Sequence, residues 1–220
     1  MRQLADAAPR TFGDGRRPAP IGELIPPRPE PDRSDPALRD VLRAATRDVH
    51  DRMHRHAGFA AIQDATIGRA EYRRLIVRLY GFYLPFEAAT SISPDRSQWL
   101  VRDLQALDLE RPLYMLPKCP HVPSLDSAHS RLGALYVVEG SALGGRDLAR
   151  SLDRLFGADV AEGRQFFIGH GPKTGEAWRG YLAQLSAAPS GARAEIIRGA
   201  VETFAAFEHW LDGWNTLSDG

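Results

Sequence analysis

Apolar residues recur every three to four positions over most of this chain, which is the period of an α-helix. The first such stretch follows Ser34-Asp35-Pro36, whose capping side chains and first-turn proline are typical of a helix start. Its apolar positions are Leu38, Val41, Leu42, Ala45, Val49 and Met53. Further helices are predicted at 69–89, about 95–108, 127–156, 175–187 and 193–212. Strand-like alternation is weak apart from an apolar patch at 166–168, so the pattern predicts an all-α fold.

Prolines interrupt this pattern at two places. Pro85 lies inside the 69–89 stretch, and because proline lacks an N–H we expect a kink or break near 82–84. Residues 110–126 contain four prolines and Cys119, which predicts a surface loop.

The N-terminal residues 1–33 differ from the rest. Eight of the sixteen prolines fall within the first 36 positions, mixed with charges of both signs. Such a segment cannot bury enough apolar surface to offset its ordering entropy, so we expect a disordered extension, with a PxxP ligand as the alternative. The remaining residues 34–216 are long and apolar enough for one helical domain around one core.

Composition excludes several classes of partner and site. Positive and negative residues are equal at 28 each, so no overall field favours nucleic acid or an anionic membrane. A single cysteine excludes an intrachain disulfide and a cysteine-based zinc or iron–sulfur centre. With no secretory signal pattern and no apolar run of about 18 residues, we expect a cytoplasmic protein.

His50 is the first candidate for chemistry. At 100° per residue it falls at about 120° from the centre of the apolar stripe, on the stripe's border. Arg43, Arg47 and His54 form a polar edge beside it. This arrangement suits a flat metal-containing ligand, with the imidazole on the metal and guanidiniums paired with carboxylates. The alternative is an ordinary surface histidine, and His54 and His56 are rival ligands.

The second candidate is a glycine-rich run, Gly140 to Gly145, inside the predicted 127–156 helix. Glycine in a helix interior costs about 1 kcal/mol relative to alanine, so three glycines need a reason. Gly140 and Gly144 share a face at i, i+4 spacing, with Tyr136 one turn earlier. A face without side chains serves either close helix packing or the approach of a flat ligand, and spacing leaves both open.

Together these segments resemble a known family. Residues 45–50 (Ala-Thr-Arg-Asp-Val-His) resemble the proximal-helix motif of heme oxygenases, and residues 132–145 resemble their distal helix. Residues 167–171 (Phe-Ile-Gly-His-Gly) and the stretch from Thr203 to Trp210 are similar to the bacterial biliverdin-producing branch found with bacteriophytochromes. The resemblance spans about 36–214. It implies a single-domain helical bundle that holds heme b between a proximal helix and a kinked distal helix.

The resemblance also implies roles for individual residues. His50 is the axial iron ligand, and Phe204 packs near the heme. The glycines line the distal side, where the backbone and the Ser141 hydroxyl orient oxygen and hold a water. The residues implied in catalysis are Gly140, Ser141 and Gly144, and those implied in heme binding are His50, Arg43, Arg47, Tyr136, Gly140, Gly144, Gly145 and Phe204.

The implied reaction is oxidative cleavage of heme to biliverdin, with release of CO and ferrous iron. It requires dioxygen and an electron donor such as ferredoxin or a flavoprotein reductase, with a bacteriophytochrome as the biliverdin acceptor. Two positions depart from the family: Ser141 replaces a frequent aspartate, and His54 replaces a frequent carboxylate. Ser141 therefore keeps open a non-degrading heme sensor or carrier on the same fold. A thiaminase-like hydrolase using Cys119 and a di-iron oxidase are further alternatives.

Overall fold

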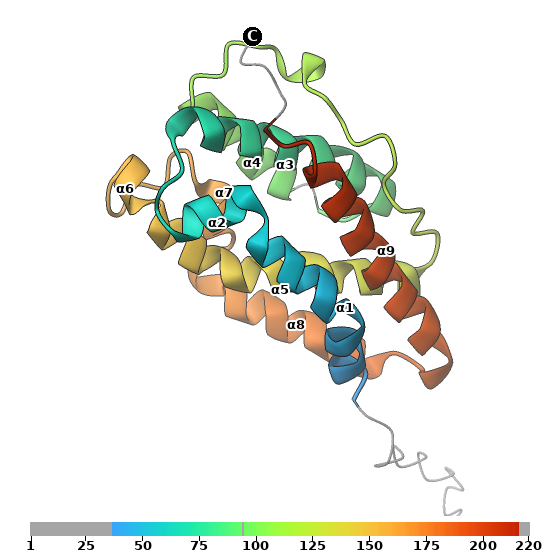
Figure 1. Ribbon diagram of the computed structural model, residues 1–220. Helices are drawn as coiled ribbons and strands as arrows, with labels where there is room; N and C mark the ends of the chain where they lie inside the picture. Colours follow the sequence, from blue (N-terminus) through green and yellow to red (C-terminus); the bar gives the residue numbers. More distant parts are fainter. Residues whose placement is uncertain (1–36, 94, 216–220) are drawn as a thin grey trace, which may run out of the picture. The chain divides into compact units, whose positions relative to one another are not determined.

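The computed structural model of this protein describes residues 37–93 and 95–215. The predicted extension at 1–33 and the helix start at Ser34-Asp35-Pro36 lie outside the described residues. The described part of the chain is helical and contains no strand, which confirms the all-α prediction (Figure 1). None of its helices is both long and apolar enough to cross a membrane.

The described residues contain nine α-helices and three short 3-10 helices. The α-helices are α1 (Leu38–Arg55), α2 (Ala57–Gln63), α3 (Arg69–Thr90), α4 (Asp95–Ala106), α5 (Ala128–Ser151), α6 (Asp153–Phe156), α7 (Gln165–Ile168), α8 (Thr174–Ala187) and α9 (Arg193–Leu211). The 3-10 helices are η1 (Leu113–Met115), η2 (Gly171–Lys173) and η3 (Ser190–Ala192).

The apolar patch at 166–168 is helical, so its strand-like interpretation is wrong. It forms most of α7, whose first N–H groups at Gln165 and Phe166 donate to the Asp103 carboxylate at 2.6 and 2.8 Å. Gly169 ends the turn with a φ of 58°, a conformation that glycine adopts without strain. A distant carboxylate thus supplies the helix cap that local sequence lacks.

Of the predicted kink or break, the break does not occur, because α3 continues through Pro85. The carbonyl that residue 85 would have bonded in an ordinary helix is that of Gly81, and it accepts instead from the N–H of Cys119 at 2.8 Å. A side chain at Gly81 would collide with the Pro117 carbonyl, so the glycine lets the 110–126 loop approach the helix. The segment is a loop as predicted apart from η1, but it does not lie wholly on the surface, because Leu116, Cys119 and Leu125 are buried in the large core.

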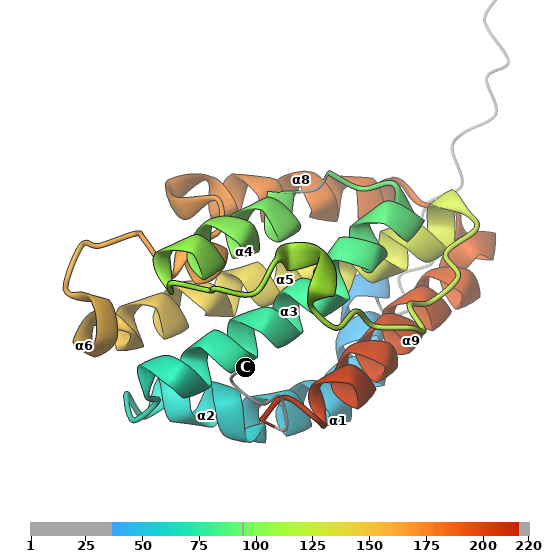
Figure 2. The ribbon, with the colours of Figure 1, turned by 90° about the horizontal axis from the view of Figure 1, so that it is seen from above.

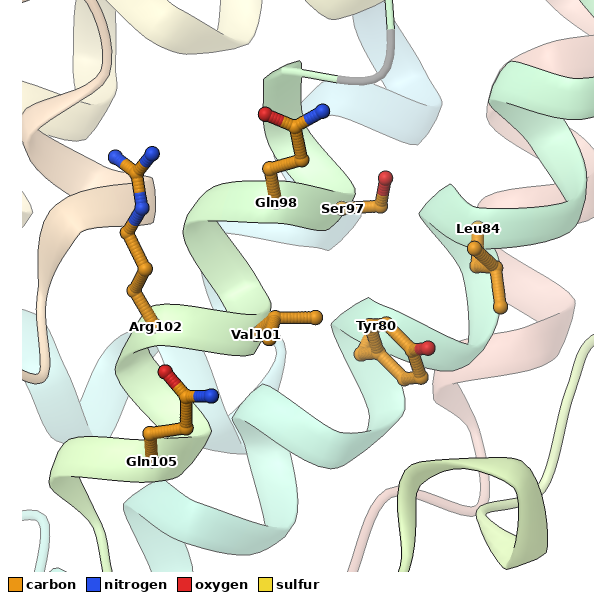
Figure 3. Close-up of a pocket in the computed structure, with 7 residues that line it drawn as sticks. All are labelled: Tyr80, Leu84, Ser97, Gln98, Val101, Arg102 and Gln105. Carbon is orange, nitrogen blue, oxygen red and sulfur yellow. The ribbon is translucent and has the colours of Figure 1, made fainter.

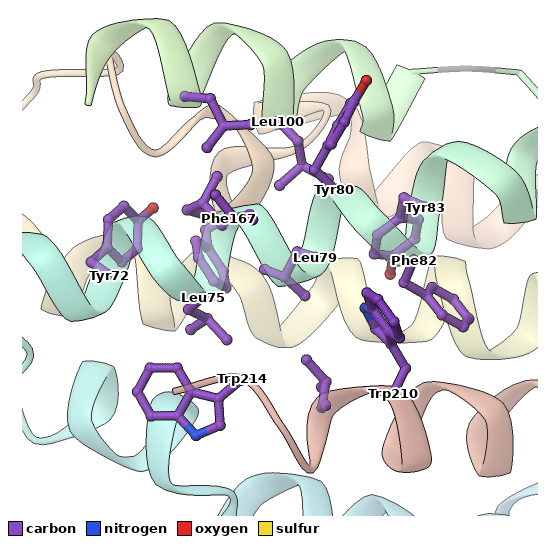
Figure 4. Close-up of a cluster of buried hydrophobic side chains, with 14 of the residues drawn as sticks. Tyr72, Leu75, Leu79, Tyr80, Phe82, Tyr83, Leu100, Phe167, Trp210 and Trp214 are labelled. Atoms are coloured by element: carbon purple, nitrogen blue, oxygen red, sulfur yellow. The ribbon is translucent and has the colours of Figure 1, made fainter. Parts of the chain in front are cut away.

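Two hydrophobic cores hold the helices together. The large core, shown in part in Figure 4, lies around α3 and includes Tyr72, Leu75, Leu79, Phe82, Leu100, Phe167, Trp210 and Trp214. The small core joins α1, α5, α8 and α9 through Leu42, Val137, Tyr181, Leu185, Ala192, Ile196, Ala200 and Phe204. Helices α5 and α9 contribute to both cores.

Glycines permit the close crossing of α5 and α9. A side chain at Gly133 of α5 would collide with the Ile196 carbonyl, and one at Gly199 of α9 would collide with the Ser130 carbonyl. Helix α8 lies alongside α5 in both views (Figures 1 and 2). The four helices of the small core therefore pack closely enough to place residues of α1 and α5 around one region.

Candidate functional site

His50 lies on the solvent-facing border of α1, as its helical angle predicts. Its side chain is 57% exposed, and its ring packs edge-on against Phe204 of α9 with centroids 6.5 Å apart. The Nε2 atom lies 3.3 Å from Nε2 of His54 one turn later, while Nδ1 lies 3.6 Å from an Asp51 carboxylate oxygen. The ring is thus positioned from both sides, with Nε2 directed along the helix surface.

The structure separates the three rival histidines. His54 shares the face of His50, with ring centroids 4.5 Å apart. His56 instead ends α1 and turns inward, where its Nε2 lies 3.3 Å from the Leu211 carbonyl and its ring packs near Trp214. Burial lowers the pKa of His56, so its neutral form is favoured. His56 is therefore engaged away from His50, whereas His54 remains beside it.

Arginines line the same helix. Arg43 and Arg47 are exposed, and their guanidiniums are available for an anionic group at the edge of the site. Arg52 plays a different part, because its Nε and a terminal nitrogen bond both oxygens of Glu208 at 2.5 and 2.8 Å. This two-bond contact attaches α1 to α9 and holds His50 near Phe204.

The distal candidates lie on different sides of α5. A side chain at Gly144 would have nothing within 4 Å, and one at Gly140 would meet only the Trp178 ring at 3.8 Å. Tyr136, one turn earlier, packs near Trp178 and Tyr181 of α8 at 6.1 and 6.4 Å between centroids. Gly140 and Gly144 thus form a bare stretch that close helix packing does not require.

Gly145 differs from those two glycines. A side chain there would lie 2.9 Å from the Phe167 carbonyl of α7, so its absence is explained by helix packing. Phe204 is buried in the small core beside His50. The structure thus places Phe204 in the small core with Tyr136 packed against it, His50 at its exposed border beside Phe204, and Gly145 against α7.

Ser141 is exposed, but it belongs to a polar network with the buried Tyr83 and Arg96 that the sequence did not reveal. Its hydroxyl donates to the Val138 carbonyl at 2.9 Å and also bonds the Tyr83 phenol. Burial raises the pKa of Tyr83, while Arg96 and the Ser141 bond oppose this rise. Arg96 in turn bonds Glu139 at 2.8 Å. The network brings hydroxyl groups to the helix that carries the bare glycines, and no local motif joins its three helices.

The carboxylates of the di-iron alternative are both engaged in this region. Glu139 pairs with Arg96, and Glu87 accepts the backbone N–H groups of Arg96 and Ser97 at 2.9 and 3.1 Å. Glu87 therefore caps the first turn of α4 instead of facing a metal. The thiaminase-like alternative is also weakened, because burial raises the pKa of the Cys119 thiol and disfavours the nucleophilic thiolate.

The residues present fit a flat ligand with a metal at its centre. His50 offers an exposed imidazole nitrogen, and the bare stretch of α5 offers backbone with no side chain over Gly144. On α8, in the small core, the Tyr181 hydroxyl is buried and has no hydrogen-bond partner among the described residues. A buried hydroxyl without a hydrogen-bond partner is unusual in a protein core, and a polar group of a bound ligand would supply the missing hydrogen bond.

A separate groove opens between α3 and α4 (Figure 3). Its volume is about 410 Å³, and it is lined by Tyr80, Leu84, Ser97, Gln98, Val101, Arg102 and Gln105. No residue of α1 or α5 takes part, so this groove is distinct from the region around His50.

This all-helical bundle has the heme oxygenase fold. The heme oxygenase family model matches residues 37–213, and the chain belongs to this family. No curated protein matches it in sequence.

Solved structures show the same fold at low sequence identity. The heme oxygenase from Leptospira interrogans is 16% identical with a TM-score of 0.63, covering 80% of this chain and 98% of that one. The heme complex of heme oxygenase-1 from Synechocystis is 16% identical with a TM-score of 0.60, covering 82% and 93%. The NO- and CO-bound enzyme from Neisseria meningitidis is 22% identical with a TM-score of 0.62, covering 84% and 95%.

Proposed function

We propose that this protein binds heme b between α1 and α5 and cleaves it oxidatively to biliverdin, CO and ferrous iron. The observation that carries the proposal is the pairing of His50, exposed at the border of the small core, with the bare stretch at Gly140 and Gly144. Membership of the heme oxygenase family over residues 37–213 supports it. Heme is both the substrate and the source of the redox chemistry.

On the proximal side, the protein holds one imidazole in place. His50 would hold the iron through Nε2, since its Nδ1 faces the Asp51 carboxylate, which favours the tautomer with a free Nε2. Phe204 supports the ring from α9. Arg43 and Arg47 pair with the propionates, and Tyr136 contacts the heme from α5.

On the distal side, backbone replaces side chains. Gly140 and Gly144 allow the helix to approach the heme plane, where they orient dioxygen, and Gly145 closes this segment against α7. Ser141, bonded to the Tyr83 phenol, would hold a water beside the bound heme. These hydroxyl groups take the place of the aspartate that is frequent in the family.

Electrons come from a separate protein. The exposed Arg43 and Arg47 give the proximal edge positive charge, and this suits an acidic ferredoxin or the acidic surface of a flavoprotein reductase. A bacteriophytochrome is the proposed acceptor of biliverdin, and the proposed location is the cytoplasm.

The axial role of His50 is tested by substitution and heme reconstitution. His50→Ala removes the imidazole that meets the iron, so the five-coordinate histidine spectrum should disappear and heme affinity should fall by about tenfold or more. His54→Ala is the matched control, because it removes the neighbouring imidazole on the same face and should retain the spectrum. A histidine-ligated spectrum that survives in His50→Ala and is lost in His54→Ala would assign the iron to His54.

The second candidate function is a heme sensor or carrier, which Ser141 in place of an acidic residue favours. A reductant and dioxygen added to the heme complex distinguish the two functions. Loss of heme absorbance with the appearance of biliverdin supports the oxygenase. An intact heme spectrum under the same conditions supports the carrier.

A further inference from the structure

The proposed function uses only one of the two imidazoles that share the face of α1. His54 stands one turn after His50, with both rings exposed and their Nε2 atoms 3.3 Å apart. A hydrogen bond between two solvated imidazoles gives little stability, since water can replace either partner. The pair is therefore available for another ligand.

The spacing of the two nitrogens matches a metal chelate. Two Zn–N bonds of about 2.0–2.1 Å at a tetrahedral angle place the nitrogens about 3.3 Å apart. Histidines at i and i+4 on one helical face are also the arrangement with which HExxH helices hold zinc. Here the segment reads His50-Asp51-Arg52-Met53-His54, so the spacing is the same. Asp51 faces Nδ1 of His50 at 3.6 Å, as outer partners of metal-bound imidazoles commonly do.

We propose that the heme-free protein binds a divalent transition-metal ion, of which Zn²⁺ is the representative, through Nε2 of His50 and Nε2 of His54. Among the described residues, no group of three or more His, Cys, Asp or Glu side chains is placed to hold a metal. The two imidazoles therefore supply the protein ligands and solvent completes the coordination. Such an open site exchanges its metal and follows the usual order, with Cu²⁺ bound more tightly than Ni²⁺ or Zn²⁺.

The divalent metal ion and heme then exclude each other from the protein. This consequence rests on the proposed function, in which His50 binds the heme iron. Both need the same Nε2 atom of His50, so one bound metal blocks axial ligation of heme iron. By thermodynamic reciprocity, zinc lowers heme affinity by the factor by which heme lowers zinc affinity.

Calorimetric titration of the heme-free full-length protein with zinc at pH 7.5 tests the site. Wild type should bind one Zn²⁺ that both His50→Gln and His54→Gln weaken by about tenfold or more, since each variant leaves a single imidazole. His209→Gln, which removes an exposed histidine from α9, is the matched control and should bind zinc as wild type does. All substituted side chains are exposed, and circular dichroism checks that each variant is folded.

Equal zinc affinity in wild type and His54→Gln overturns the proposal, as does an equal loss in His209→Gln. Heme added to the zinc-loaded protein should release the metal to a chromophoric chelator. Retention of zinc in a protein that has taken up heme overturns the exclusion. A protein that binds zinc through both histidines but takes up no heme would instead refute the proposed function and leave the metal site standing.

Discussion

Asp103 illustrates what individual residues contribute beyond their place in a motif. Its side chain is fully buried, yet its two oxygens accept the first N–H groups of α7. Burial raises its pKa to about 7 from the ordinary 3.8, although the two N–H bonds act to lower it. Burial and, to a smaller extent, the charge of Asp103 raise the pKa of Tyr72 well above its usual value, and Arg164 opposes this rise. Nothing in the local sequence distinguishes Asp103 from a surface carboxylate.

This residue makes stability depend on pH. Between pH 3.8 and about 7 the folded state holds a proton on Asp103 that the unfolded state has lost, so the free energy of unfolding falls as pH rises through this window. The contribution is complete below 3.8 and lost above 7. At 1.36 kcal/mol per pH unit, we expect a loss of about 2 kcal/mol from pH 5 to pH 7 that Asp103→Asn does not show. Urea unfolding of both proteins from pH 5 to pH 8 measures it.

Other titrating groups, including His56 and Glu87, are common to both proteins, so they cancel in the difference between the two curves. Parallel curves for wild type and Asp103→Asn would show that the carboxyl titrates outside this range.

At the level of the element, the glycines of α5 lack a side chain for different structural reasons. Gly133 and Gly145 are bare because another backbone approaches them, whereas Gly144 faces open space. Spacing along the helix groups Gly140, Gly144 and Gly145 together, and only the neighbouring helices separate them. The Gly81–Pro85 segment of α3 also depends on a distant part of the chain, since loop residues 117–119 approach Gly81 and the Cys119 N–H bonds the Gly81 carbonyl.

Gly144→Ala separates fold stability from ligand binding. Alanine in the helix interior should raise the free energy of unfolding by about 0.5–1 kcal/mol, because no atom lies within 4 Å of the added methyl group. Heme affinity should nevertheless fall by about tenfold, as the methyl group enters the space of the proposed ligand. Gly180→Ala in α8 is the control, since its methyl group also meets nothing; it should stabilise without changing heme affinity. Equal heme affinities in the two variants would remove Gly144 from the site.

At the level of the whole molecule, the crossing of α5 and α9 connects the two cores. Val138 and Trp210 belong to the large core, while Val137 and Phe204, on the same two helices, belong to the small core. The crossing is close because Gly133 and Gly199 carry no side chain. Any separation of these helices therefore loosens both cores and moves Phe204 relative to His50.

We expect Gly133→Ala to destabilise the protein by about 1–3 kcal/mol despite the better helix propensity of alanine, because its methyl group collides with the Ile196 carbonyl. Chemical unfolding followed by circular dichroism and by tryptophan fluorescence measures the change. A stabilisation similar to that of Gly180→Ala would show that the crossing has room for a side chain.

The sequence by itself determined the helical class, the extent of most helices, and the candidate residues His50, Gly140 and Gly144. These follow from local rules, since helical periodicity and glycine propensity act within a few residues of each position. Tertiary structure alone decided that His56 turns inward to the Leu211 carbonyl, why Gly145 differs from Gly144, and how α3 continues through Pro85. Each of these outcomes depends on a group tens of residues away, such as the Cys119 N–H that bonds the Gly81 carbonyl. The Asp103 carboxylate that caps the start of α7 is a further example of such a distant group. Local sequence patterns do not predict such contacts, because the contacts form only when distant helices pack.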